Sequence, residues 1–173
     1  MKLLLIFSLL ISSLFAHPHT FIDIHPTVKM INNNKFIINF KWMIDDMTST
    51  MLMMELDQNG DGKLNKKESD YAKKEYFSIF KDYNYYTYIL VKGKKVKFPV
   101  AKNFKASMKN NKICYSFDIE LNQNIKDTVF EFGDTDFYVA MILKKEFVTT
   151  KGLPFTVTGV DNDFYYGYKL EFK

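Results

Sequence analysis

The sequence lacks the features that would supply a disulfide, several membrane spans or a nucleic-acid surface. Cys114 is the single cysteine among 173 residues, so an intramolecular disulfide is excluded. No second long apolar run follows the amino-terminal one, so we expect no transmembrane helix after it. Lysines and acidic residues are interspersed, and the formal net charge is only +4. This distribution is typical of a solvated surface and argues against nucleic acid as a partner.

The chain also lacks the residue sets of common enzymes. We find no Ser, His and Asp or Cys and His arrangement that supplies a nucleophile beside a base, and no glycine-rich phosphate loop. We therefore expect a protein that is not an enzyme. The enzymatic alternative is an oxidative copper enzyme with an amino-terminal histidine brace. That geometry needs a second imidazole opposite the His17 chelate, and only His19 and His25 are available.

The first sixteen residues, MKLLLIFSLLISSLFA, are typical of a secretory signal peptide. Lys2 supplies the positive charge, and an apolar and hydroxyl run ends at Ala16, where the sequence turns polar. The run is short for a membrane span, and no basic cluster follows it. Cleavage after Ala16 would leave 17–173 as a single periplasmic domain that begins at His17, with peripheral or no membrane contact. A retained amino-terminal anchor is the alternative.

Alternating apolar residues predict an α+β protein that is mainly antiparallel β, with a sandwich-like or mixed sheet. The segments 20–31 and 35–44 flank an asparagine turn and predict a hairpin. One face of the second segment is apolar at every other position: Phe36, Ile38, Phe40, Trp42 and Ile44. Short segments of the same kind, separated by Gly, Pro, Asp or Asn, continue from residue 85 to the end. The region 46–82 interrupts them and indicates an EF-hand-like helical insertion.

Two helices are expected within this insertion. The first carries Met47, Met51 and Met54 at helical spacing, and we interpret these methionines as core residues rather than as ligands of a soft metal. The second is expected over about 66–82. Its apolar positions follow the helical period: Ala72, Tyr76, Ile79, Phe80 and Tyr83.

The segment DQNGDGKLNKKE, residues 57–68, matches the EF-hand calcium loop. Gly62 stands at position six, where the sharp turn needs a left-handed backbone. The predicted oxygen ligands are Asp57, Asn59, Asp61, Lys63 through its carbonyl, Asn65 through a water and Glu68. We expect Ca²⁺ to act as a structural clip between the two helices, because a single loop lacks the partner loop of calcium sensors. The alternative is a polar turn of similar sequence.

All three histidines lie between residues 17 and 25. In extended backbone, His17, His19, Asp23 and His25 share one face, and a free amine at His17 would add a nitrogen donor. Nitrogen-rich sites of this kind suit Zn²⁺, Ni²⁺, Cu²⁺ or Co²⁺. Pro18 has no N–H, which excludes the copper and nickel mode that uses the amide of the second residue. The alternative is that these histidines are solvated or are ordinary strand residues.

More distant carboxylates are candidate partners of the histidines. Two aspartate pairs stand at predicted strand ends, Asp45 with Asp46 and Asp134 with Asp136. Each aspartate is alternatively a turn former or, for the first pair, a helix cap. The complete predicted transition-metal set is His17, His19, Asp23, His25, Asp45 and Asp134.

These motifs together resemble the uncharacterised ABC-type transport-system periplasmic component family, domain of unknown function 1007. The matching segments are 17–19, 21–23, 42–47, 57–68 and 134–140. The resemblance implies a periplasmic accessory protein that captures Zn²⁺, Ni²⁺ or Co²⁺ for an inner-membrane metal permease. It also implies site roles for four of the residues above: His17, His19, Asp45 and Asp134. The competing hypothesis is a non-catalytic interaction domain in which calcium is the only ion.

Overall fold

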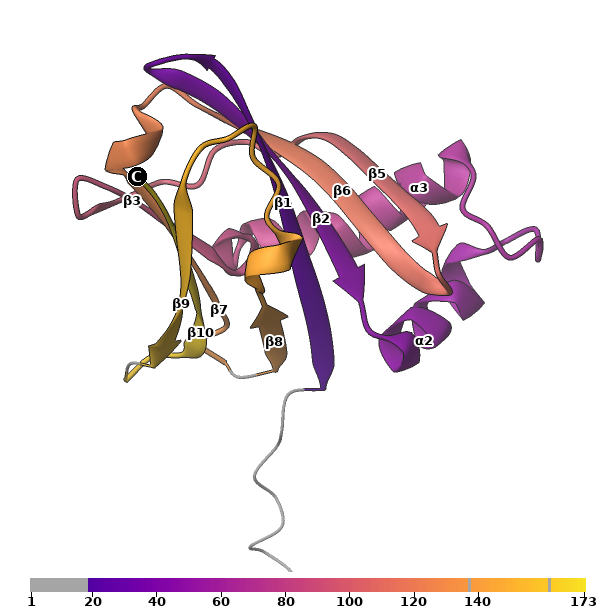
Figure 1. Cartoon of the computed structure of the whole chain (residues 1–173). Coiled ribbons are helices and arrows are strands. Elements are labelled where there is room, and N and C mark those ends of the chain that lie inside the picture. Colours follow the sequence, from indigo (N-terminus) through magenta and orange to yellow (C-terminus); the bar gives the residue numbers. More distant parts are fainter. Residues whose placement is uncertain (1–18, 137, 162) are drawn as a thin grey trace, which may run out of the picture.

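The predicted hairpin of residues 20–31 and 35–44 is confirmed in the computed structural model, which describes residues 19–136, 138–161 and 163–173 (Figure 1). Strand β1 (Thr20–Asn32) pairs antiparallel with β2 (Lys35–Ile44). The predicted signal peptide and His17 lie outside the described residues.

Within the described residues, the strands form two sheets of five strands each, so the fold is mostly β as predicted. Sheet A has the order β5-β6-β2-β1-β8, and sheet B has the order β4-β3-β7-β10-β9. All neighbours pair antiparallel except β1 and β8, which are parallel. The remaining strands are β3 (Thr87–Val91), β4 (Lys94–Val96), β5 (Lys102–Lys109), β6 (Lys112–Leu121), β7 (Thr128–Gly133), β8 (Val139–Ile142), β9 (Phe155–Asp161) and β10 (Tyr166–Phe172).

The helical region lies between β2 and β3, where the sequence predicts it. Helix α2 spans Asp46–Leu56 and α3 spans Lys66–Ala72. A π-helical turn, η1 (Lys73–Phe77), and a 3-10 turn, η2 (Ser78–Lys81), continue α3. Further short 3-10 turns are η3 (Asn84–Tyr86), η4 (Ile125–Asp127) and η5 (Lys145–Phe147). No helix among the described residues is long and apolar enough to cross a membrane.

The core lies on one face of sheet A. The predicted apolar face of β2 is fully buried, together with the alternating residues of β6: Ile113, Tyr115, Phe117, Ile119 and Leu121. Phe40 packs edge-on against Phe130 and Phe132 of sheet B, while Trp42 packs against Phe77 and Phe80 of the helical region. Sheet B and the helical region therefore cover the same face of sheet A at different ends, and Figure 1 shows α3 beside β5 and β6.

The prediction that Met47, Met51 and Met54 are core residues is wrong, because their exposed fractions are 64%, 63% and 83%. Helix α2 instead turns Ser49 and Leu56 inward, with Leu52 and Met53 partly buried beside them. The Ser49 hydroxyl donates to the Ile44 carbonyl and accepts from the Ile113 N–H, which removes the cost of burying it. The helical spacing was correct, but the opposite face of the helix is buried.

The predicted second helix is also only partly correct. Ala72 is buried, but Ile79 and Tyr83, which the helical period assigns to the same face, are exposed. The reason is the change of period after Ala72, since a π turn and a 3-10 turn rotate later residues away from the face that an α-helix would present. Phe77, at the end of the π turn, becomes the buried residue instead.

Candidate metal-binding sites

The carboxylates of the 57–68 segment bond to the backbone of the same loop. Asp57 Oδ2 accepts from the Gly62 N–H at 2.8 Å, and Asp57 Oδ1 accepts from the Asp61 N–H at 3.1 Å. Asn59 Oδ1 also accepts from the Asp61 N–H, and Asp61 Oδ1 accepts from the Lys63 N–H at 2.8 Å. Gly62 has φ 74°, a left-handed value that glycine adopts without strain. Three predicted ligands are thus held around residues 61–63.

Glu68 closes this loop from the first turn of α3. Its side chain is only 2% exposed, and Oε1 accepts from the N–H groups of Gln58 and Asn59 at 3.1 and 3.3 Å. Oε2 accepts from the Asn65 N–H at 2.8 Å, while the Asn65 side chain caps α3 by accepting from the Glu68 N–H. The last predicted ligand therefore joins the beginning of the loop to its end.

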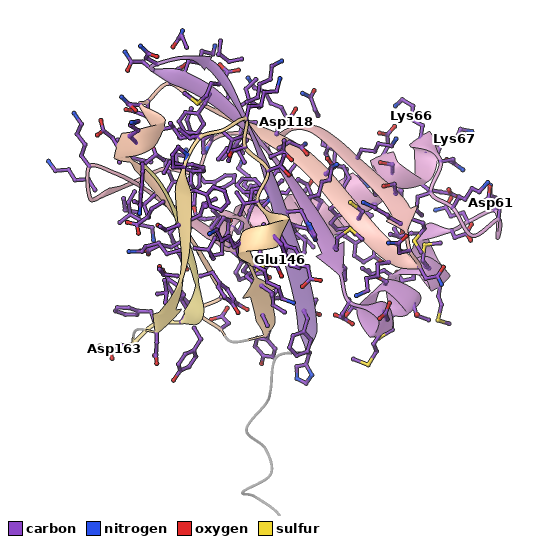
Figure 2. All side chains as sticks on the ribbon, viewed as in Figure 1. Asp61, Lys66, Lys67, Asp118, Glu146 and Asp163 are labelled. Atoms are coloured by element: carbon purple, nitrogen blue, oxygen red, sulfur yellow. The ribbon has the colours of Figure 1, made fainter. Side chains whose placement is uncertain are left out.

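The tip of the loop is open to solvent. Figure 2 shows Asp61 at the far end of the loop, with Lys66 and Lys67 on the adjoining helix. Lys63 is exposed, and the Lys66 Nζ pairs with Asp70 at 2.7 Å. This ion pair directs one of the three nearby lysines along α3 rather than toward the loop carboxylates.

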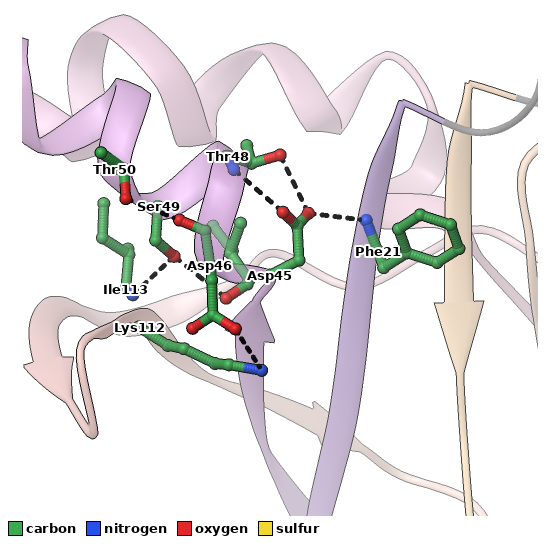
Figure 3. Close-up of polar contacts among 9 residues, drawn as sticks. Phe21, Asp45, Asp46, Thr48, Ser49, Thr50, Lys112 and Ile113 are labelled. Atoms are coloured by element: carbon green, nitrogen blue, oxygen red, sulfur yellow. Dashed lines mark hydrogen bonds and ion pairs between the residues drawn. The ribbon is translucent and has the colours of Figure 1, made fainter.

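Asp45 joins the end of β2 to the beginning of β1 (Figure 3). Its Oδ2 accepts from the Phe21 N–H and its Oδ1 from the Thr48 N–H, both at 2.9 Å, and the Thr48 hydroxyl donates to it as well. Partial burial acts to raise the pKa of Asp45, but the hydrogen bonds from Thr48 and Phe21 outweigh it and lower the pKa. The capping role that the sequence left open is thus confirmed. The neighbouring Asp46 is 3.8 Å from the Lys112 Nζ.

Asp134 has a similar role on the other side of β1. It follows β7, is buried, and accepts hydrogen bonds from the N–H groups of Asp136, Tyr138 and Val139 at 2.9 to 3.0 Å. It thereby shapes the loop before β8, the strand that pairs with β1. Asp136 is exposed at the same loop. Of these two aspartates, Asp134 is therefore the one whose carboxylate is held in place by backbone N–H groups.

Three predicted ligands, His19, Asp45 and Asp134, lie around the beginning of β1 without forming one group of metal ligands among the described residues. The exposed His19 donates its N–H to the Tyr138 carbonyl at 2.9 Å, and the two rings stack with centroids 6.0 Å apart. Asp45 lies on the β2 side of β1 and Asp134 on the β8 side. His17, the predicted chelating terminus, precedes this point and lies outside the described residues.

Asp23 and His25 lie elsewhere, farther along β1 on the outer face of sheet A. They line a pocket of about 410 Å³ together with Lys41, Lys109 and Phe147. Figure 2 places Glu146, another lining residue, on a short helix in front of β1. His19 and His25 are six residues apart in extended backbone, roughly 20 Å, so they cannot share one ion. The predicted set therefore divides into two groups.

His25 is partly buried, unlike the exposed His19. Its ring stacks on Phe147 with centroids 4.1 Å apart. Burial lowers the pKa of His25, and Lys109 and Lys41 add to this effect while Asp23 opposes it. The sequence did not reveal this pocket, since Lys41, Lys109 and Phe147 are far apart along the chain and carry no shared motif.

Across residues 19–136, 138–161 and 163–173, no three His, Cys, Asp or Glu side chains are grouped as ligands of one metal ion. A calcium loop also uses amide and backbone carbonyl oxygens. The predicted amino-terminal site depends in addition on His17.

The fold and these sites define a two-sheet β protein with a polar loop between two helices. The chain belongs to the family described as "Protein of unknown function (DUF1007)", whose profile matches residues 2–159. It is 30% identical over 97 residues to the "Uncharacterized 15.5 kDa protein in trpE 3'region" of Spirochaeta aurantia, which covers 54% of this chain and 69% of that protein. An "Uncharacterized protein" of Haemophilus influenzae is 28% identical over 132 residues, 73% of this chain. The chain spans 62% of that relative, less than two thirds. The predicted family is confirmed, and the link to transport stays a prediction.

Proposed function

We propose that this protein is a periplasmic metal-binding accessory protein of a zinc, nickel or cobalt transport system, with a structural Ca²⁺ in an EF-hand-like loop at 57–68. The observation that carries the proposal is the position of Glu68. This buried carboxylate belongs to α3, yet it bonds to both the beginning and the end of the loop that carries Asp57 and Asp61. The predicted first and last calcium ligands thus belong to one closed loop.

The chemistry of the loop supports calcium as its ion. Calcium prefers six to eight hard oxygens, and the loop offers carboxylates at Asp57, Asp61 and Glu68 and an amide oxygen at Asn59. The backbone N–H groups hold these side chains in place before an ion enters. Three lysines in the same segment reduce the attraction for a cation. We therefore expect weak binding, about 10⁻⁴ to 10⁻³ M, as in extracellular calcium modules.

Glu68→Gln is expected to remove most of the thermal stabilisation that calcium gives. Glutamine keeps the side-chain length and the capping function, but it loses the negative charge and the bidentate carboxylate. At ten times Kd, calcium stabilises a folded protein by about 1.4 kcal/mol. The melting temperature should be measured with EGTA and with increasing CaCl₂.

The matched control is Glu75→Gln, in the π turn that continues α3. This change removes a carboxylate that pairs with Lys74 outside the loop, so the calcium response should be unchanged. A wild-type protein that does not respond to calcium, or a Glu68→Gln variant that responds equally, would contradict the calcium assignment.

The amino-terminal end of β1 is the proposed capture site for the transported metal. Asp45 and Asp134 each already accept three hydrogen bonds, so we assign the direct ligands to the amine and imidazole of His17 and to the His19 imidazole. The two carboxylates supply negative charge on either side of the strand. Exposure of His19 leaves the ion accessible to an inner-membrane permease, the partner in this proposal.

Calorimetric titration of the mature protein with Zn²⁺, Ni²⁺ and Co²⁺ tests this site. The double variant His17→Ala/His19→Ala is expected to bind at least about 100-fold more weakly, because it loses both assigned imidazoles. The matched control is His25→Ala, which removes an imidazole roughly 20 Å farther along β1 and should leave the affinity unchanged. Equal affinity of the wild type and the double variant would contradict the site. A calcium response without such binding would instead favour the calcium-stabilised interaction domain.

A further inference from the structure

A second cluster of potential ligands lies between α2 and the hairpin of β5 and β6. A pocket of about 460 Å³ is lined there by three methionines, Met53 and Met54 of α2 and Met108 of β5. Its other lining residues are Ser49, Thr50, Asp57 and Asn111. Residues more than fifty positions apart therefore bring three thioethers to one cavity.

The sulfur atoms of this region are accessible from solvent. Met54 is 83% exposed, and Met53 and Met108 are each partly exposed. Figure 2 shows sulfur atoms, in yellow, around α2 and the adjoining ends of β5 and β6. Met53 and Met108 pack against the core with part of their side chains, while Met54 is the most exposed of the three. Three methionines therefore line one pocket that solvent reaches.

The chemistry of the thioether group makes this pocket suited to a soft metal ion. Methionine sulfur is a soft, neutral ligand that selects Cu(I) over hard divalent ions. The methionine side chain is unbranched and flexible, so three thioethers on the walls of one pocket can turn toward a common ion. Among the described lining residues the charged one is Asp57, an anion, so no ammonium group in the pocket opposes a cation.

We propose that Met53, Met54 and Met108 form a binding site for a soft monovalent cation, Cu(I), in the pocket between α2 and β5. The site is separate from the capture site at β1 in position, ligand type and preferred ion. Asp57 is common to this pocket and the calcium loop. Both of its carboxylate oxygens accept hydrogen bonds within the loop, from the N–H groups of Asp61 and Gly62.

Competition titration with Ag(I) tests the proposal on the mature protein, because Ag(I) has the same charge and softness and needs no reductant. The triple variant Met53→Leu/Met54→Leu/Met108→Leu keeps side chains of similar volume at the three positions and removes the sulfur atoms. We expect the wild type to bind one Ag(I) and the triple variant to bind at least about tenfold more weakly. Circular dichroism and the melting temperature of each variant establish that it is folded.

The matched control is Met47→Leu/Met51→Leu, which removes two exposed sulfur atoms of the same helix that do not line the pocket. The control is expected to keep the wild-type affinity. Ag(I) binding that survives in the triple variant, or that is lost in the control, overturns the assignment. So does a wild type that does not bind Ag(I). The Zn²⁺ titration of the His17→Ala/His19→Ala variant is independent of this result, so either site can fail alone.

Discussion

Gly167→Ala is expected to destabilise the protein by about 3 kcal/mol or more, the upper end of the cost of overpacking. Gly167 lies in β10 opposite Gly133 of β7. A Cβ atom added at Gly167 would lie 1.8 Å from the Phe132 carbonyl oxygen and 2.9 Å from its carbon. These are backbone atoms in the middle of sheet B, so the clash cannot be relieved by a side-chain rotation. Urea unfolding followed by circular dichroism measures the effect.

Gly159→Ala is the control for this change. Gly159 lies in the neighbouring strand β9, and a Cβ atom there would have no heavy atom within 4 Å. Its substitution should shift the free energy of unfolding by less than about 1 kcal/mol, because the site has room for a methyl group. Similar losses in the two variants would show that the close approach between β10 and β7 is not what requires glycine at residue 167.

Trp42→Ala is expected to cost about 4 kcal/mol in the free energy of unfolding. Trp42 has no exposed surface and packs against Phe77 and Phe80 of the helical region and Phe117 of β6, with ring centroids 5.1 to 6.2 Å apart. Its removal leaves a cavity where the helical region meets sheet A. Because Trp42 is the only tryptophan, unfolding must be followed by circular dichroism rather than by tryptophan fluorescence.

Two further variants test whether lost packing explains the loss of stability expected for Trp42→Ala. The Trp42 indole N–H has no hydrogen-bond partner among the described residues. Trp42→Phe therefore also removes an unsatisfied buried donor, and it should cost clearly less than Trp42→Ala. Phe21→Ala removes an aromatic ring that is half-exposed on β1, and a loss below about 1 kcal/mol is expected. A Phe21→Ala loss as large as that of Trp42→Ala would contradict the position of the core.

The strands were predictable because their signal is local. In β2 every second residue is apolar, and the period of a strand turns all five of these side chains to one face. The long apolar series of β6 follows the same rule. The parallel pairing of β8 with β1 was not predictable in this way, since it depends on which edge of the sheet a distant segment reaches.

The helices show where a periodic pattern is insufficient. Spacing in α2 identifies two possible faces, and hydrophobicity favours the methionine face. The structure buries the other face, where Leu56 packs into the core. On the same face, the Ser49 hydroxyl donates to the Ile44 carbonyl at the end of β2 and accepts from the Ile113 N–H at the beginning of β6. Neither partner is adjacent to Ser49 in sequence. The burial of Leu56 and the hydrogen bonds of Ser49 together fix the orientation of the helix.

The candidate sites also differ in how far the sequence alone could predict them. The 57–68 loop was predictable as a unit because its ligands follow one another over twelve residues, and the backbone turns at Gly62 as the motif requires. Asp134 accepts from N–H groups two to five residues later, and Asp45 accepts from Thr48 three residues later, so these bonds are local. Only the bond from the Phe21 N–H to Asp45 required the tertiary structure, because the pairing of β1 with β2 brings Phe21 to it. The separation of His25 from His19 follows from β1, which begins at Thr20, directly after His19, and stays extended through His25.

The sequence by itself determined the family, the mostly β fold, the hairpin at residues 20–44 and the polar loop at 57–68, since each depends on short-range order in the chain. Tertiary structure decided which helix face is buried, that the Phe21 N–H reaches Asp45, and which methionines share a pocket. These are contacts between residues far apart in sequence. Their free energy depends on burial and hydrogen-bond partners that exist only after the two sheets and the helices have packed together.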